Sequence, residues 1–98
     1  MATKKRKYVI IRSRDAGCFA GEIESRKDDT VVMIKARRLW YWSGAASLSQ
    51  MAQEGVSKPT GCKFPPLVDR QEIFGVIEIL DATDKCRKSI EGVPVWRA

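Results

Sequence analysis

Residues 8–38, YVIIRSRDAGCFAGEIESRKDDTVVMIKARR, decide the fold. Residues 8–11 and 30–34 are rich in β-branched side chains, which favour strands. Asp and Gly at residues 15–17, and two Asp residues at 27–29, are typical of tight turns. The segment between these turns returns with strand-like composition. The pattern therefore predicts three antiparallel strands in a meander.

The rest of the chain predicts two short helices and further strands. We expect, in order, a helix over residues 43–55, a loop over 56–70, a buried strand over 71–80, a helix over 81–92 and an edge strand over 93–96. Ser43 and Asp81 are the expected N-caps of the two helices. The expected fold is α+β, with an antiparallel sheet of about four to five strands, a β-meander, and two short helices.

Length and charge divide the chain into a tail and one domain. Ninety-eight residues are too few for two separate cores, so residues 8–98 are expected to form a single domain. Residues 1–7 are expected to be a basic, disordered tail that carries Lys4, Lys5, Arg6 and Lys7. The formal net charge is +6, from 18 basic and 12 acidic residues; without the tail it is 14 − 12 = +2. The tail predicts salt-sensitive contacts with nucleic-acid phosphates.

The composition argues against several classes of function. The chain has no histidine, the commonest general base and a common zinc ligand. Its three cysteines, Cys18, Cys62 and Cys86, are far apart and form neither a CxxC motif nor a disulfide framework. No apolar run approaches the ~18 residues of a membrane span. We therefore expect no enzyme, metal site or cofactor, and no association with a membrane.

The segment KARRLWYWSGAAS, residues 35–47, combines cations, aromatic residues and a run of small residues. If the third strand continues to Trp42, alternate side chains share a face. One face then carries Arg38, Trp40 and Trp42, and the other carries Arg37, Leu39 and Tyr41. One of these faces packs on the core, and the sequence does not decide which. The plain alternative is that the tryptophans are core residues and the arginines are solvated.

The same segment is the best candidate for a ligand site. Arginines bind phosphate, aromatic rings stack on bases, and the free N–H groups of a helix start attract anions. The predicted ligand-binding residues are Arg12, Arg14, Arg37, Arg38, Trp40, Tyr41, Trp42, Gly44, Ala45, Ser47 and Gln50.

Several strings resemble those of a known family. ARRLWYWSGAASLSQ at residues 36–50, VIEI at 76–79 and SIEGVPVW at 89–96 are similar to a family of small proteins of tailed bacteriophages and prophages. This resemblance implies a phage protein that acts in the host bacterial cytoplasm. It brings no catalytic mechanism.

In size and site chemistry, the chain is also similar to phage counter-defence proteins that sequester nucleotide immune signals. We therefore predict a non-catalytic homo-oligomer that captures a small anionic nucleotide-like ligand, such as a cyclic nucleotide. Two alternatives stay open. One is an accessory phage protein that binds host nucleic acid, and the other is an inhibitor that binds a host protein through its exposed aromatic residues.

Overall fold

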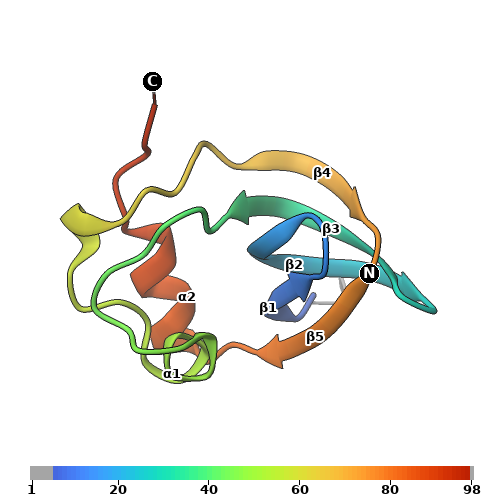
Figure 1. Ribbon diagram of the computed structural model, residues 1–98, viewed down its shortest axis with the longest axis horizontal. Coiled ribbons are helices and arrows are strands. Elements are labelled where there is room, and N and C mark those ends of the chain that lie inside the picture. The colour runs from blue at the N-terminus through green and yellow to red at the C-terminus, as the bar shows by residue number, and fades with distance from the viewer. Residues whose placement is uncertain (1–5, 98) are drawn as a thin grey trace, which may run out of the picture.

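Five strands and two short helices make up the computed structural model, which describes residues 6–97 (Figure 1). The strands are β1 (Tyr8–Ser13), β2 (Gly17–Lys27), β3 (Thr30–Arg38), β4 (Val68–Ile73) and β5 (Val76–Asp81). The two helices are α1 (Leu48–Glu54) and α2 (Asp84–Glu91), and a short 3₁₀ turn, η1 (Pro59–Gly61), follows α1. This confirms the predicted α+β fold and the meander of the first three strands.

The sheet bends back on itself. Its strand order is β4-β3-β2-β1-β5, and every neighbouring pair is antiparallel. β4 and β5 are consecutive in the chain, yet they lie at opposite edges of the sheet. The Val76 N–H donates to the Asp29 carbonyl at 2.9 Å, which ties the start of β5 to the turn between β2 and β3. The strands therefore curve around a common interior, as Figure 1 shows.

Two apolar clusters fill the molecule, one on each face of the sheet. The cluster inside the curved sheet contains Val9, Ile11, Phe19, Val31, Met33, Ala36 and Ile73. The cluster between the sheet and the helices contains Ile10, Ala20, Leu39, Met51, Ala52, Val56, Cys62, Phe64, Cys86, Ile90 and Val93. Alternate residues of β1 enter different clusters because side chains along a strand alternate between faces. β1 is therefore buried on both sides.

The predicted strand over 71–80 is wrong, because the chain turns in its middle. β4 ends at Ile73, and Gly75 adopts a positive φ of 69° that starts the new direction. The Ser13 hydroxyl donates to the Phe74 carbonyl at 2.7 Å and holds this turn against the end of β1. A run of apolar residues indicates that a segment is buried, but it does not show where the chain turns. Two strands that share one apolar run are therefore predicted as a single strand.

The predicted helix boundaries also need correction. α1 begins at Leu48, because the Ser47 hydroxyl and not Ser43 caps it, accepting the Gln50 N–H at 3.2 Å. α2 is capped by Thr83 and not by Asp81, which is the last residue of β5. The observed caps lie four residues after Ser43 and two residues after Asp81, so both helices begin later than the sequence predicted.

Two predicted strand segments are not strands. β3 ends at Arg38 and does not continue to Trp42. The segment 93–96 forms only an isolated parallel bridge, between Val95 and Phe64. Both segments lie against the loop that precedes β4, so they are extended chain without a continuous strand partner.

Candidate functional site

Arg37 is a structural residue and not a phosphate ligand. Its side chain is buried, with the residue only 6% exposed. The guanidinium donates to the carbonyls of Ile90 at 2.7 Å, Val93 at 2.8 Å, Phe64 at 3.2 Å and Pro65 at 3.2 Å. Burial lowers the pKa of Arg37 from its usual value, because the charged form loses solvation. Arg37 thus joins the end of β3 to α2 and to the loop before β4, which removes it from the candidate site.

The other predicted arginines also contact their own protein. Arg38 donates to the Ala16 carbonyl at 2.7 Å, and its guanidinium lies 4.5 Å from the Phe19 ring centroid. Arg12 pairs with Glu78 at 3.2 Å, and Arg14 pairs with Asp15 at 3.5 Å. These three side chains therefore point toward β5 and the turn between β1 and β2, and they form no joint cluster with Arg37.

The predicted anion site at a helix start does not form. Gly44 lies outside α1, and its carbonyl accepts the Ser57 N–H at 3.2 Å. A Cβ at Gly44 would lie 2.5 Å from the Lys58 nitrogen, so the absent side chain serves close backbone packing. Ala45 packs against the helix-side cluster. Ser47 caps α1, and the Gln50 amide oxygen accepts the Ala46 N–H at 2.8 Å. These residues build the loop.

The tail prediction falls partly on residues whose structure is described. Arg6 lies 4.0 Å from the carboxylates of Glu22 and Glu24, and Lys7 lies 3.3 Å from that of Asp81. These two cations are therefore attached to the sheet and are not part of a free tail. Lys4 and Lys5 lie outside the described residues.

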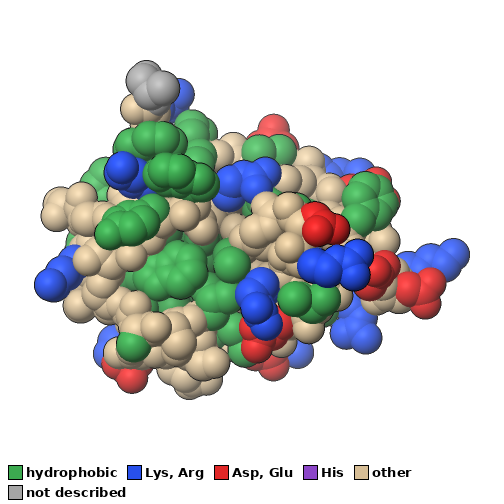
Figure 2. Space-filling view, viewed as in Figure 1, with side chains coloured by type: hydrophobic (Ala, Val, Ile, Leu, Met, Phe, Trp, Pro, Cys, Tyr) green, Lys and Arg blue, Asp and Glu red, His purple; other side chains and the backbone are tan. Residues whose placement is uncertain are grey.

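The exposed aromatic residues form a distinct surface, which we call the aromatic surface: Trp40, Tyr41, Lys63 and Trp96. Trp40 is 58% exposed, Tyr41 54% and Trp96 39%. The Trp40 and Trp96 rings are stacked, with centroids 5.3 Å apart and planes 7° apart. The Lys63 ammonium lies 5.4 Å from the Trp40 centroid, 5.9 Å from Tyr41 and 5.7 Å from Trp96. Figure 2 shows hydrophobic side chains gathered near the C-terminal end, with basic side chains beside them.

Three distant segments bring this surface together. Tyr41 and Lys63 exchange two backbone hydrogen bonds, with the Lys63 N–H donating to the Tyr41 carbonyl at 2.7 Å. The Trp96 N–H donates to the Phe64 carbonyl at 3.0 Å. Trp42, which we predicted on the same face as Trp40, is instead half-buried and packs on the helix-side cluster. The alternation fails because β3 ends before the aromatic residues begin.

Sequence reasoning missed Lys63 and Trp96 as site residues. Each lies in a segment that we expected to be a loop or an edge strand, 22 or more residues from Tyr41. No local pattern identifies them, because their place beside Trp40 depends on the backbone pairing between the segments. The sequence offers one indication: Trp96 is a large aromatic residue in a segment that we expected at the edge of the sheet.

The charges around the aromatic surface are largely unopposed. Residues 30–68 contain one acidic residue, Glu54, and no acidic residue follows Glu91. Among residues 6–97, six of the cations form ion pairs: Arg6, Lys7, Arg12, Arg14, Arg70 and Arg87. Lys58, Lys63, Lys85 and Lys88 are exposed and form none within that part of the chain. Cations therefore outnumber carboxylates in the segment 30–68, which carries Trp40, Tyr41 and Lys63.

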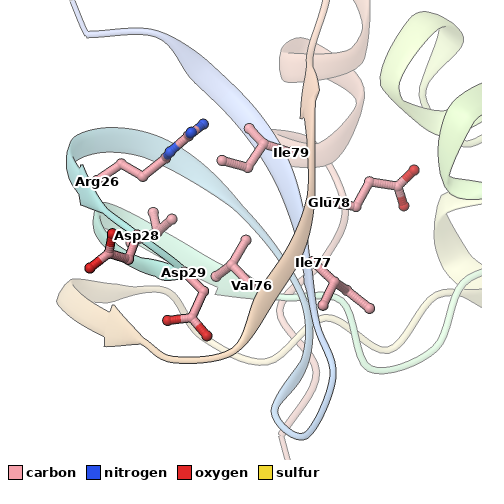
Figure 3. A pocket seen from close by; sticks show the side chains of 8 residues that line it. Arg26, Asp28, Asp29, Val76, Ile77, Glu78 and Ile79 are labelled. Carbon is pink, nitrogen blue, oxygen red and sulfur yellow. The ribbon is translucent and has the colours of Figure 1, made fainter.

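A separate cavity of about 320 Å³ lies between β5 and the turn that joins β2 to β3 (Figure 3). Arg26 at the end of β2 and Asp28 and Asp29 of the turn line one side, and three apolar residues of β5 with Glu78 line the other. It mixes charges of both signs and contains none of the predicted site residues. Within residues 6–97, no three Cys, Asp or Glu side chains are grouped in a way that could hold a metal ion.

Two of the cysteine thiols, Cys18 and Cys86, are not activated as nucleophiles. Burial raises the pKa of the Cys86 thiol to about 11 and also raises the pKa of Cys18. Because the thiolate is the reactive form, both side chains are protonated and unreactive near neutral pH.

The comparison with protein families gives one match. The family described as a domain of unknown function, DUF6948, matches residues 6–90. The chain belongs to the DUF6948 family. The DUF6948 match includes Trp40, Tyr41 and Lys63 and ends before Trp96. No curated protein and no solved structure gives a significant match. In the described part of this DUF6948 protein, no helix is long and apolar enough to cross a membrane.

Proposed function

We propose that this protein binds single-stranded nucleic acid without catalysing a reaction. In this proposal, bases stack on the aromatic surface and the unpaired lysines beside it hold the phosphate backbone. The observation that carries the proposal is the exposed, parallel Trp40–Trp96 pair with the Lys63 ammonium beside both rings.

The exposure of these rings needs a reason. Tryptophan is the side chain that gains most from burial, and both stacked rings remain accessible to solvent. Stacking of a base on such a ring contributes about 1–3 kcal/mol and does not depend on base identity, because every base has a π-face. Lys63 adds a positive charge where a phosphate next to a stacked base would lie. This combination suits the binding of single-stranded nucleic acid with little preference for base sequence.

The open shape of the aromatic surface favours a nucleic-acid strand as the ligand over a small, enclosed molecule. Sites for small molecules bury most of the ligand, whereas these side chains lie on an exposed surface of one protomer. Capture of a cyclic nucleotide would need a second protomer to close the site. Capture of a cyclic nucleotide and inhibition of a host protein stay predictions, which the outcomes below distinguish from strand binding. The setting in the cytoplasm of a phage-infected cell also stays a prediction.

The test is a fluorescence anisotropy titration with labelled single-stranded DNA and RNA of about 15 nucleotides, a length that spans sites of this kind. Trp40→Ala is expected to weaken binding by about fivefold to a hundredfold, because it removes one stacking ring. Phe74→Ala is the matched control. Phe74 is an aromatic residue that is 64% exposed but lies at the turn between β4 and β5, so this variant should bind as the wild type does.

Other results would contradict the proposal. Equal binding by Trp40→Ala and the wild type would exclude the aromatic surface as the site. A large rise in the melting temperature with cyclic nucleotides, and no binding of either strand, would support the sequestration hypothesis instead. No response to any nucleotide or strand would reject both and favour a protein partner.

A further inference from the structure

A cavity of about 510 Å³ lies between α1 and α2. Lys85 and Lys88 line it from α2, where they are one helical turn apart, and Gln50 and Glu54 line it from α1. Both lysines are exposed, and within residues 6–97 neither forms an ion pair. The two ammonium groups outnumber the single carboxylate, so the cavity has a net positive charge.

Two paired chain segments lead from the aromatic surface to this cavity. Residues 41–44 run beside residues 57–63: Tyr41 pairs with Lys63, and the Ser43 N–H donates to the Cys62 sulfur at 3.4 Å. At the end of this contact, Gly44 and Ser57 are hydrogen-bonded to each other, and both line the cavity. The cavity thus begins where the two paired segments end, with exposed Lys58 next to Ser57.

The polar groups of the cavity suit a phosphate. The Gln50 amide oxygen is occupied by the Ala46 N–H, so the amide NH₂ is the part left to donate. The lysine ammonium groups are compact charges that bind phosphate oxygens. Glu54 opposes an anion there, which limits affinity and makes the site sensitive to the charge at that position.

We infer that this cavity is a phosphate-binding subsite, which holds the phosphodiester backbone of the same strand whose bases stack on the aromatic surface. The inference rests on the proposed function and extends it. The bases and the backbone would be bound by separate parts of the protein, so each part can be tested by itself.

The first test compares two double variants at several salt concentrations. Lys85→Ala/Lys88→Ala removes two phosphate contacts, so the slope of log affinity against log salt should fall in magnitude by about 1.4. Between about 50 and 200 mM salt, this variant should lose about sevenfold less affinity than the wild type. Arg26→Ala/Lys27→Ala is the matched control, with the same charge change near the turn that joins β2 to β3, away from the helices (Figure 1). It should keep the wild-type slope.

The second test separates backbone from base. An oligonucleotide that lacks all bases should shift the amide NMR signals of Gly44, Gly55 and Ser57, which line the cavity, and leave the Trp40 indole N–H signal unchanged. Adenosine, which has no phosphate, should do the reverse. Glu54→Gln should tighten binding of the abasic strand, since it removes the opposing charge.

The outcomes distinguish this inference from the proposed function. If the wild type binds normal strands but the double lysine variant keeps the full salt slope, the subsite is rejected and the aromatic surface stands. Abasic strands that shift no cavity amide would reject it too. If the wild type binds no strand at all, the proposed function fails, and with it this inference.

Discussion

The two halves of the molecule use charge differently. Around the sheet, most of the ion pairs join a cation to a carboxylate on another element, as for Arg70 with Glu24 at 3.1 Å and Arg87 with Glu22 at 2.8 Å. Arg26, Lys27 and Lys35 of the sheet are exposed and form no ion pair within residues 6–97. On the side formed by α1, α2, the loops and the C-terminal segment, Lys58, Lys63, Lys85 and Lys88 form no ion pair within residues 6–97, and two tryptophans are exposed. The ion pairs of the first side satisfy carboxylates of the protein itself. The second side combines unpaired lysines with exposed aromatic area, and our proposals assign it to ligand binding.

Helix α2 shows this difference within eight residues. Arg87 faces the sheet, pairs with Glu22 and Glu91, and lies 4.8 Å from the Tyr8 ring centroid. Lys85 and Lys88, on either side of it in the sequence, line the cavity toward α1. We therefore expect substitutions of paired cations to change stability, and substitutions of unpaired cations to change binding.

The largest effect on stability should come from the buried arginine. Arg37→Met removes four hydrogen bonds, which should cost about 3–5 kcal/mol of unfolding free energy. The Phe64 and Ile90 carbonyls keep backbone N–H donors, whereas the Pro65 and Val93 carbonyls lose the guanidinium donor. The neighbouring residue in the sequence provides the contrast. Arg38→Met removes one exposed hydrogen bond and should cost about 1 kcal/mol. Urea unfolding measures both. Equal costs would mean that the contacts of Arg37 are replaced when it is removed.

A smaller effect should appear at alkaline pH. The pKa of the Cys86 thiol is raised from 9.0 to about 11 by burial, so the unfolded chain loses this proton at a lower pH than the folded one. Below pH 9 the protonated thiol leaves the unfolding free energy at its full value, and this free energy falls as the pH rises toward 11. The unfolding free energy should fall by about 2 kcal/mol over this range.

Urea unfolding at pH 8, 10 and 11 measures this slope, and Cys86→Ala should reduce it. Burial also raises the pKa of Tyr8, so some alkaline dependence should remain in that variant. An unchanged slope in Cys86→Ala would assign the whole effect to other groups.

The smallest effect tests the comparison within α2 directly. Arg87→Met should cost about 1 kcal/mol, because Arg87 and Glu22 are partly shielded from solvent. Its side-chain hydrogen bonds to Glu91 and Glu22 raise the pKa of Arg87, in agreement with a stabilised cation. Lys88→Met should leave the unfolding free energy unchanged within error. Thermal unfolding at low and high salt measures both, and a salt-sensitive loss is expected only for Arg87→Met. A larger loss for Lys88→Met would reverse the comparison.

Local patterns were enough to predict the meander. Turn residues and β-branched runs act through nearest neighbours, so the bounds of β1, β2 and most of β3 follow from residues 8–38. The same kind of reasoning failed at Phe74 and Gly75, where one apolar run crosses between two strands. It also failed beyond Arg38, because alternation holds only while the strand continues.

The candidate site was predicted in part. Trp40 and Tyr41 are both exposed, although the predicted alternation placed them on opposite faces and left open which face packs on the core. We predicted Arg37 as a phosphate ligand, but its guanidinium is buried among four carbonyl groups. The sequence alone does not distinguish these two environments of an arginine. The partners of Arg37 at Ile90 and Val93 are 53 and 56 residues away.

The sequence by itself determined the α+β class, the first three strands and a chain whose central segment is poor in acidic residues. Those properties depend on composition and on neighbours in the chain. Only the tertiary structure decided which cations are free, that Trp96 stacks on Trp40, and that the loop from Gly44 opens beside Lys85 and Lys88. Each of these depends on contacts between segments far apart in the sequence, where packing of the whole core selects the neighbours.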